Sequence, residues 1–178
     1  MNDITSTEKK VAMMIANGFN EPEFIASQKA IMAQQAQANI ITCHNGLVYS
    51  DPTTGNGISY AADSQLSETL AIDYDCLIVV GGPKHIDILT EDPHAIRLMR
   101  AFLRESMPIL LVSEASKLLV VIGDTRFASD YISDRNFVQS DSVLWSINGS
   151  GLSTCFKRFF KIVSANQLKQ DTDDGVAA

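Results

Sequence analysis

Hydrophobic residues of the chain are grouped into short continuous runs rather than strict alternations. Such runs cover residues 10–16, 39–43, 74–80, 109–113 and 143–146. A run without polar alternation is typical of a strand that is covered on both faces, as in a parallel sheet. The pattern therefore predicts a mainly parallel sheet built from these five segments.

Segments with helical spacing lie between these runs. Apolar residues recur at helical intervals over residues 24–38, 92–104 and 152–163, and residues 114–121 continue from a strand as a further helix. Asp92 is the predicted N-cap of its helix, with Pro93 at the first helical position. Strands that alternate with helices predict right-handed crossovers, and therefore an α/β, doubly wound sheet with helices on both faces.

The remaining segments are shorter or polar. Turn-forming residues dominate 45–63, where pieces at 47–49 and 58–60 predict a small hairpin. Residues 66–72 predict a brief helix and 124–141 an irregular segment. We expect one domain over residues 9–165. The polar ends at 1–8 and 166–178 predict flexible termini, because such segments bury too little apolar surface to order themselves.

Composition narrows the functional classes. The 178 residues suit one domain, and a net charge of −7 gives no basic surface for nucleic acid or anionic lipid. No apolar run approaches the roughly 20 residues of a membrane-spanning helix. The first eight residues show no export signal, and three cysteines are more typical of a reducing compartment. The sequence predicts a cytoplasmic protein with no nucleic-acid or membrane partner.

Nucleotide cofactors are disfavoured by the motifs. Neither the glycine-rich dinucleotide fingerprint nor the phosphate-binding P-loop pattern occurs, so no bound cofactor is predicted. In doubly wound sheets, ligands meet the carboxyl ends of the strands. That rule selects a set of candidate residues for a small-molecule site: Glu23, Cys43, His44, Gly81, Gly82, His85, Ser113 and Glu114.

Ser113 lies where a strand turns into a helix. A residue at such a bend can be presented at the helix N-terminus as a nucleophile. A serine needs a partner base for that role, and the next residue is Glu114 rather than histidine. The simpler interpretation is that Ser113 caps the helix and Glu114 complements its dipole. Both interpretations stay open at this point.

A metal site is the weaker alternative. Glu23, Cys43, His44 and His85 follow strands at the same sheet edge, and their donor atoms suit zinc. No paired-ligand spacing such as C-x-x-C fixes two of them together. The sequence therefore predicts no metal.

Three segments resemble the DJ-1/PfpI superfamily in order and spacing. They are I-A-N-G-F-N-E-P-E-F at 15–24, Y-D-C-L-I-V-V-G-G-P at 74–83 and M-P-I-L-L-V-S-E-A-S-K-L-L at 107–119. Residues 141–156 resemble the last strand and closing helix of that superfamily. The similarity covers roughly residues 9–165 and implies a flavodoxin-like fold.

The resemblance also assigns roles by position. In that superfamily the bend carries a cysteine, usually followed by histidine, and a glutamate from the first loop contacts the thiol. Here the glutamate is Glu23 and the loop glycines are Gly81 and Gly82, but Ser113 and Glu114 replace the cysteine and histidine. The segment S-E-A-S-K-L-L is similar to the C-terminal DJ-1/PfpI-type domain of large-subunit catalases, which lacks the cysteine.

Two functions follow as expectations. The replaced residues predict a non-catalytic, stress-related binding or assembly module, and the resemblance implies a homodimer. The alternative is a hydrolase or a glyoxalase-like enzyme, of an amidase or protease type, that uses Ser113 with Glu23 as acid or base. In that enzyme the amides near Gly82 and Glu114 would stabilise an oxyanion.

Overall fold

The computed structural model describes residues 8–128 and 135–176. Its main sheet is mostly parallel, and only β8 runs antiparallel to its neighbour β9. Among the described residues, the order across this sheet is β5 (Ser64–Gln65), β2 (Gln37–Thr42), β1 (Lys10–Met14), β6 (Cys76–Val79), β7 (Ile109–Val112), β9 (Val143–Ser146) and β8 (Phe137–Ser140). The chain thus forms the α/β, flavodoxin-like fold that the sequence predicted.

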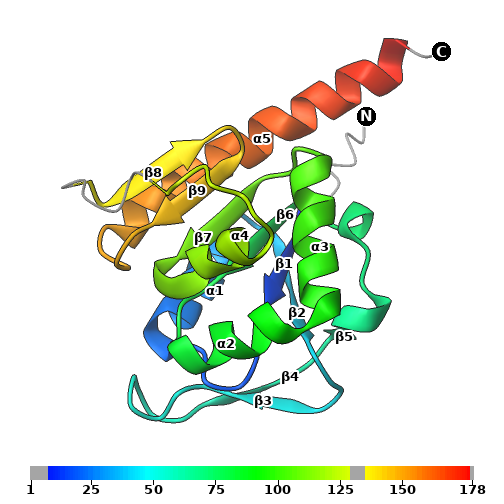
Figure 1. Cartoon of the computed structure of the whole chain (residues 1–178). Helices are drawn as coiled ribbons and strands as arrows, with labels where there is room; N and C mark the ends of the chain where they lie inside the picture. The colour runs from blue at the N-terminus through cyan, green and yellow to red at the C-terminus, as the bar shows by residue number, and fades with distance from the viewer. Residues whose placement is uncertain (1–7, 129–134, 177–178) are drawn as a thin grey trace.

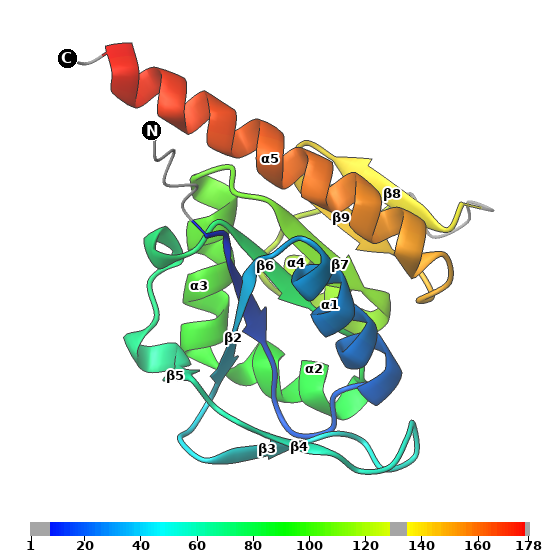
Figure 2. The ribbon, with the colours of Figure 1, turned by 180° about the vertical axis from the view of Figure 1, so that it is seen from behind.

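Helices cover both faces of the sheet (Figure 1). On one face lie α2 (Pro83–Glu91), α3 (Pro93–Arg104) and α4 (Lys117–Val121). On the other lie α1 (Glu21–Ala33) and α5 (Leu152–Val176), as the view from behind shows (Figure 2). Each central strand contributes alternate residues to the two apolar clusters, which explains its unbroken hydrophobic run.

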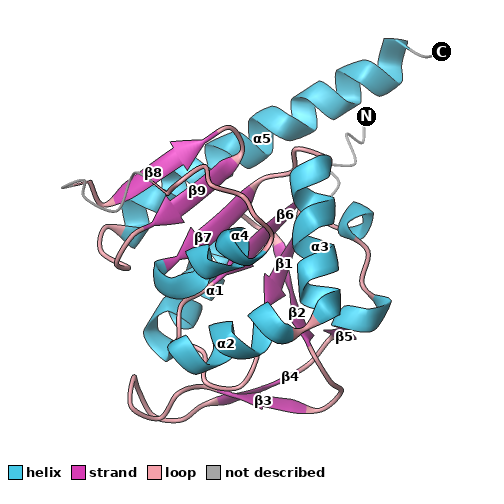
Figure 3. Ribbon diagram, viewed as in Figure 1, coloured by secondary structure: helices cyan, strands magenta, loops and turns pink. Residues whose placement is uncertain are grey.

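Smaller elements complete the fold. The predicted hairpin is present as β3 (Leu47–Tyr49) paired antiparallel with β4 (Ser59–Ala61), and it lies below the main sheet (Figure 3). The brief helix expected at 66–72 is instead two 3₁₀ turns, η1 (Leu66–Glu68) and η2 (Ala71–Asp73). Asp92 caps α3 as predicted, since its carboxylate accepts bonds from the His94 and Ala95 amides.

The predicted boundaries of two helices were wrong. Helix α1 begins at Glu21, because the Asn20 side chain caps it by accepting a bond from the Glu23 amide. It ends at Ala33 rather than residue 38, because Gln35 adopts a positive φ of 52°. Helix α5 continues to Val176, whereas the sequence predicted a flexible tail from residue 166. Its last turns extend past the sheet (Figure 1).

Helix α2 and strands β5 and β8 were missed. Helix α2 starts at Pro83, in a stretch to which the sequence analysis assigned no element, and its buried residues are His85, Ile86 and Leu89. Strand β8 lies inside the segment 124–141 that was expected to be irregular. It was hidden because an edge strand has only one neighbour and carries little apolar sequence. The predicted flexible N-terminus, residues 1–8, lies outside the described residues except for Glu8.

Within the described residues, no helix combines the length and apolar character that crossing a membrane requires.

Candidate functional site

Ser113 lies directly after β7, at the start of the 3₁₀ turn η3 (Ser113–Ser116) that leads into α4. Its φ is 50°, in the left-handed region that non-glycine residues rarely adopt, so the backbone turns sharply here. The indole nitrogen of Trp145 donates a hydrogen bond of 2.9 Å to the Ser113 carbonyl oxygen. The bend is therefore fixed from the neighbouring strand β9.

The predicted partner of Ser113 is Glu23, and the structure brings the two together. The Ser113 hydroxyl donates to Oε1 of Glu23 at 2.9 Å, and the Gly81 amide donates to Oε2 at 2.6 Å. The Glu23 side chain projects from the first turn of α1 and is buried. Since Ser113 donates to this carboxylate and no side-chain cap forms at the start of η3 or α4, the interpretation of Ser113 as a helix cap was wrong.

Burial raises the pKa of the Glu23 carboxyl above 4.5. The hydrogen bonds from Gly81 and Ser113 act in the opposite direction, and the nearby charge of Glu114 raises the pKa further. Glu23 is thus a carboxyl group with a weakened preference for its charged form, held against a serine hydroxyl.

Glu114 faces the same corner. Its Oε2 accepts a hydrogen bond of 3.1 Å from the Gly82 amide. A Cβ atom at Gly81 would lie 2.7 Å from an oxygen of Glu114 and 2.7 Å from one of Glu23, so a side chain at that position would displace the carboxylates. At Gly82 a Cβ would lie 2.5 Å from the Gly18 carbonyl oxygen, and φ is 126°. Gly81 is thus packed against the two carboxylates, whereas Gly82 is constrained by its positive φ and by the backbone of residues 18–20.

Gly149 is a member of this site that the sequence analysis did not identify. It belongs to the loop between β9 and α5, with a φ of 71°. A Cβ there would lie 2.8 Å from Oε1 of Glu23 and 3.5 Å from the Ser113 hydroxyl. The available signal was the N-G-S-G turn at 148–151, but a turn motif does not reveal what it covers.

His85 is not a ligand-binding residue of this site, contrary to the prediction. It is fully buried in α2, where Nδ1 accepts a hydrogen bond from the Ala16 amide and Nε2 faces the Val80 carbonyl at 2.8 Å. Burial lowers the pKa of its imidazole to about 4. The neutral ring therefore joins the ends of β1 and β6 as a structural bridge.

The remaining candidates do not converge on Ser113. Cys43 is half-buried, and burial together with the nearby Asp92 raises its pKa to about 12, so it is a poor nucleophile. His44 is exposed in the turn before β3. Both follow β2, which is separated from β7 by β1 and β6. Over residues 8–128 and 135–176, no three histidine, cysteine or acidic side chains form a metal-binding group.

Of two cavities in the part of the chain that the structure describes, neither is lined by Ser113 or Glu23. One of about 290 Å³ lies between the β3 hairpin and α2, with Tyr49 and Lys84 in its walls. The other, of about 140 Å³, lies between α4 and β9. Neither of them gives a substrate access to the serine hydroxyl.

Comparison with known proteins agrees with the fold. The family model described as DJ-1/PfpI matches residues 9–127. No curated protein matches the chain. Among solved structures, a ThiJ/PfpI domain protein from Brachyspira murdochii superposes with a TM-score of 0.74 at 14% identity, covering 88% of this chain and 96% of that one. DJ-1 of Schizosaccharomyces pombe gives a TM-score of 0.69 at 16% identity, covering 88% and 90%.

A two-domain protein from Anabaena variabilis, with DJ-1/ThiJ/PfpI-like and ferritin-like domains, gives a TM-score of 0.79 at 16% identity. The alignment covers 88% of this chain but only 48% of that protein, so the chain spans about half of its length. At these identities the likeness concerns the fold. Together with the family match over residues 9–127, it places the chain in the DJ-1/PfpI family.

Proposed function

We propose that this protein is a non-catalytic member of its family, and that it acts as a binding or assembly module. The observation that carries the proposal is the arrangement of the two carboxylates. The Gly81 amide is bonded to Glu23 and the Gly82 amide to Glu114, while the Ser113 hydroxyl is bonded to Glu23. The groups that an acyl-transfer enzyme would direct at its substrate are therefore bonded to the protein itself.

Electrostatics support the same conclusion. Acyl transfer through a serine develops negative charge on an oxyanion, which needs free N–H donors or positive charge nearby. At this corner the nearest charged groups are Glu23 and Glu114, which would oppose that charge. A serine also needs a base such as histidine. The three histidines of the chain are the buried bridge His85 and the exposed His44 and His94.

The test is covalent labelling of the purified protein with a serine-reactive fluorophosphonate. We expect the intact mass to stay unchanged after long exposure. Ser116, the last residue of η3, provides the matched control, because it is a half-buried serine of the same turn. Labelling that disappears in Ser113→Ala but persists in Ser116→Ala would overturn the proposal.

One observation favours the alternative of a hydrolase or glyoxalase-like enzyme. Ser113 has the positive φ of a strained elbow, and strain of this kind is often found at catalytic residues. The raised pKa of Glu23 also makes it a better base than an ordinary carboxylate. This enzyme requires that a substrate displaces Glu114 from the Gly82 amide. Turnover of a dicarbonyl, ester or amide that Ser113→Ala abolishes would establish it.

The proposed module is a homodimer in the reducing cytoplasm, with a stress-related role. Pairing and role rest on the family resemblance, and the location rests on the three free cysteines. The segment at 113–119 resembles the corresponding segment of the catalase C-terminal domain, which also lacks the cysteine. Sedimentation velocity over a range of protein concentrations tests the pairing, and a concentration-independent monomer would contradict it.

A further inference from the structure

The cavity between α4 and β9 has an apolar floor and an open rim. Its floor consists of Leu119, Phe127 and Trp145, none of which is more than 6% exposed. At the rim, Val120 is an apolar side chain that remains 74% exposed, and Ala128 is exposed beside it. A cavity with these walls binds an apolar group more favourably than it binds water, because a water molecule there would lose hydrogen bonds.

The walls are held in place by contacts outside the cavity. The Trp145 indole donates to the Ser113 carbonyl, so its ring plane is fixed. The Phe127 ring lies against it, with 5.8 Å between ring centroids and 37° between planes. A rigid aromatic floor costs little to organise when a ligand binds, which is the property expected of a preformed site.

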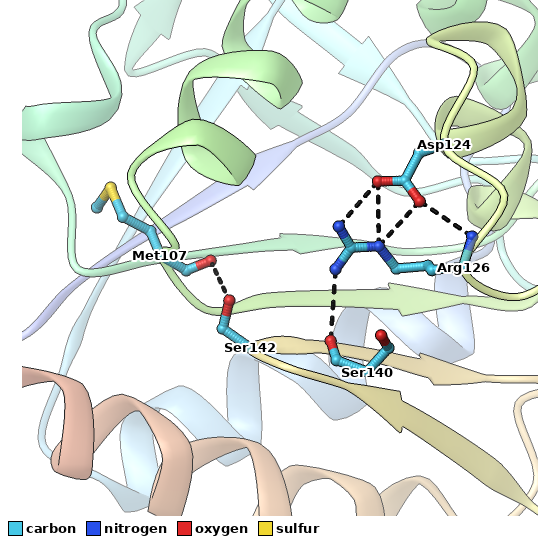
Figure 4. Close-up of polar contacts among 5 residues, drawn as sticks. All are labelled: Met107, Asp124, Arg126, Ser140 and Ser142. Atoms are coloured by element: carbon cyan, nitrogen blue, oxygen red, sulfur yellow. Dashed lines mark hydrogen bonds and ion pairs between the residues drawn. The ribbon is translucent and has the colours of Figure 1, made fainter.

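Charge selects the class of ligand. Asp124 also lines the cavity, and both of its oxygens are bonded to Arg126, whose remaining nitrogen donates to the Ser140 carbonyl (Figure 4). The residues that line the cavity include no lysine, arginine or histidine. Arg126 already balances the charge of Asp124, so the lining residues offer no further cation to balance an anionic ligand. The hydroxyls of Ser116 and Thr125 leave room for one polar contact.

We propose that this cavity is a binding site for a small neutral molecule with an apolar, ring-sized body and one hydroxyl or carbonyl group. Its volume of about 140 Å³ fits a single six-membered ring, since a protein cavity of about 150 Å³ accommodates benzene. The ligand would pack on Trp145 and Phe127 and cover Val120. This site is separate from the Ser113 corner and does not depend on its chemistry.

The sole tryptophan of the chain reports on the site directly, because Trp145 forms part of its floor. We expect benzyl alcohol and cyclohexanol each to change the Trp145 emission saturably in the full-length protein. Benzoate, which matches benzyl alcohol in size but is anionic, is expected to bind at least tenfold more weakly. Absence of a saturable change with both alcohols would overturn the proposal, and so would equal binding of benzoate.

Two neighbouring valines supply matched variants. Val120 lines the cavity and Val121 does not, although both are exposed residues of α4. We expect Val120→Asp to weaken benzyl alcohol binding at least tenfold, and Val121→Asp to change it less than twofold. Both side chains face solvent, so folding is expected to persist, and circular dichroism verifies it. Equal weakening by both variants, or none by either, would place the ligand elsewhere and overturn the assignment.

Discussion

The Glu114 carboxylate accepts a 3.1 Å hydrogen bond from the Gly82 amide, and this pairing directs its negative charge toward Glu23. The two acidic residues come from α1 and from the turn after β7, which are far apart in the sequence. Their common neighbour is Gly81, which has no side chain to separate them. The corner of the sheet therefore contains two carboxylates around one serine hydroxyl.

Removing the charge of Glu114 should lower the pKa of Glu23. Glu114→Gln keeps an oxygen that accepts from Gly82 but removes the like charge. Because the like charge of Glu114 raises the Glu23 pKa, that pKa should fall in the variant. A carbon-13 NMR titration of the Glu23 carboxyl measures the change. Glu91→Gln, at an exposed helix end, serves as the control; an unchanged or higher Glu23 pKa in Glu114→Gln would contradict the coupling.

The same titration has a consequence for stability. A carboxyl with a raised folded-state pKa favours the folded protein below its unfolded value, and this contribution is lost as the pH rises through the folded pKa. Glu114→Gln narrows the gap between the two values for Glu23. The loss of stability on going from acid to neutral pH should therefore be smaller in the variant than in the parent protein.

Gly149→Ala should disrupt the contact between Ser113 and Glu23. The new methyl group would lie 2.8 Å from Oε1 of Glu23, in addition to the strain of a positive φ. Gly123→Ala isolates the strain, because its φ is 79° and nothing lies within 4 Å of a Cβ there. We expect Gly123→Ala to lower the free energy of unfolding by about 1 kcal/mol. Gly149→Ala should lower it clearly more, and urea unfolding measures both. Equal costs would show that Gly149 is not packed on Glu23.

His85 should make the fold sensitive to acid. Its pKa falls from 6.5 to about 4 because the folded protein buries the neutral ring. Its contribution is thus present above pH 6.5 and is lost as the pH falls toward 4, on the order of 3 kcal/mol. Unfolding free energies measured across that range should decline less steeply in His85→Gln. The exposed His94→Gln should retain the parental slope, and a steep decline in both variants would assign the effect to other groups.

The Asp124–Arg126 pair should contribute measurably to stability. Both side chains are about one-fifth exposed, and they are joined at 2.8 Å. Hydrogen bonds from Arg126 lower the pKa of Asp124 below 3.8, so this contribution is present above that value and is lost as the pH falls through the lowered pKa. Arg126→Met should cost about 1–2 kcal/mol at neutral pH, between the values for buried and surface pairs.

The exposed pair of Arg104 and Glu105 provides the comparison, because these side chains are 73% and 58% exposed. Arg104→Met should cost less than about 0.5 kcal/mol, since solvent screens that pair. Thermal or urea unfolding of both variants distinguishes the two cases. A similar cost for the two substitutions would mean that partial burial does not strengthen the Asp124–Arg126 pair.

Local patterns were sufficient to predict the central strands and the capped helix α3. The runs at 74–80 and 109–113 contain strands β6 and β7, and Asp92 caps α3 as its position before Pro93 indicated. In contrast, α2 and β8 were missed because their sequences are short and half polar. Helix α2 is held by the burial of three residues rather than by a strong helical pattern.

The sequence by itself determined the central strands and the residue types at the strand ends, because burial on two faces leaves a local hydrophobic signature. Only the tertiary structure decided which candidates meet. In the fold the Ser113 hydroxyl is bonded to Glu23, and Gly149 packs against both residues. The His85 side chain points into the core and accepts a bond from the Ala16 amide. These pairings depend on how distant segments are brought together by the sheet, and no local pattern encodes the direction in which a side chain points.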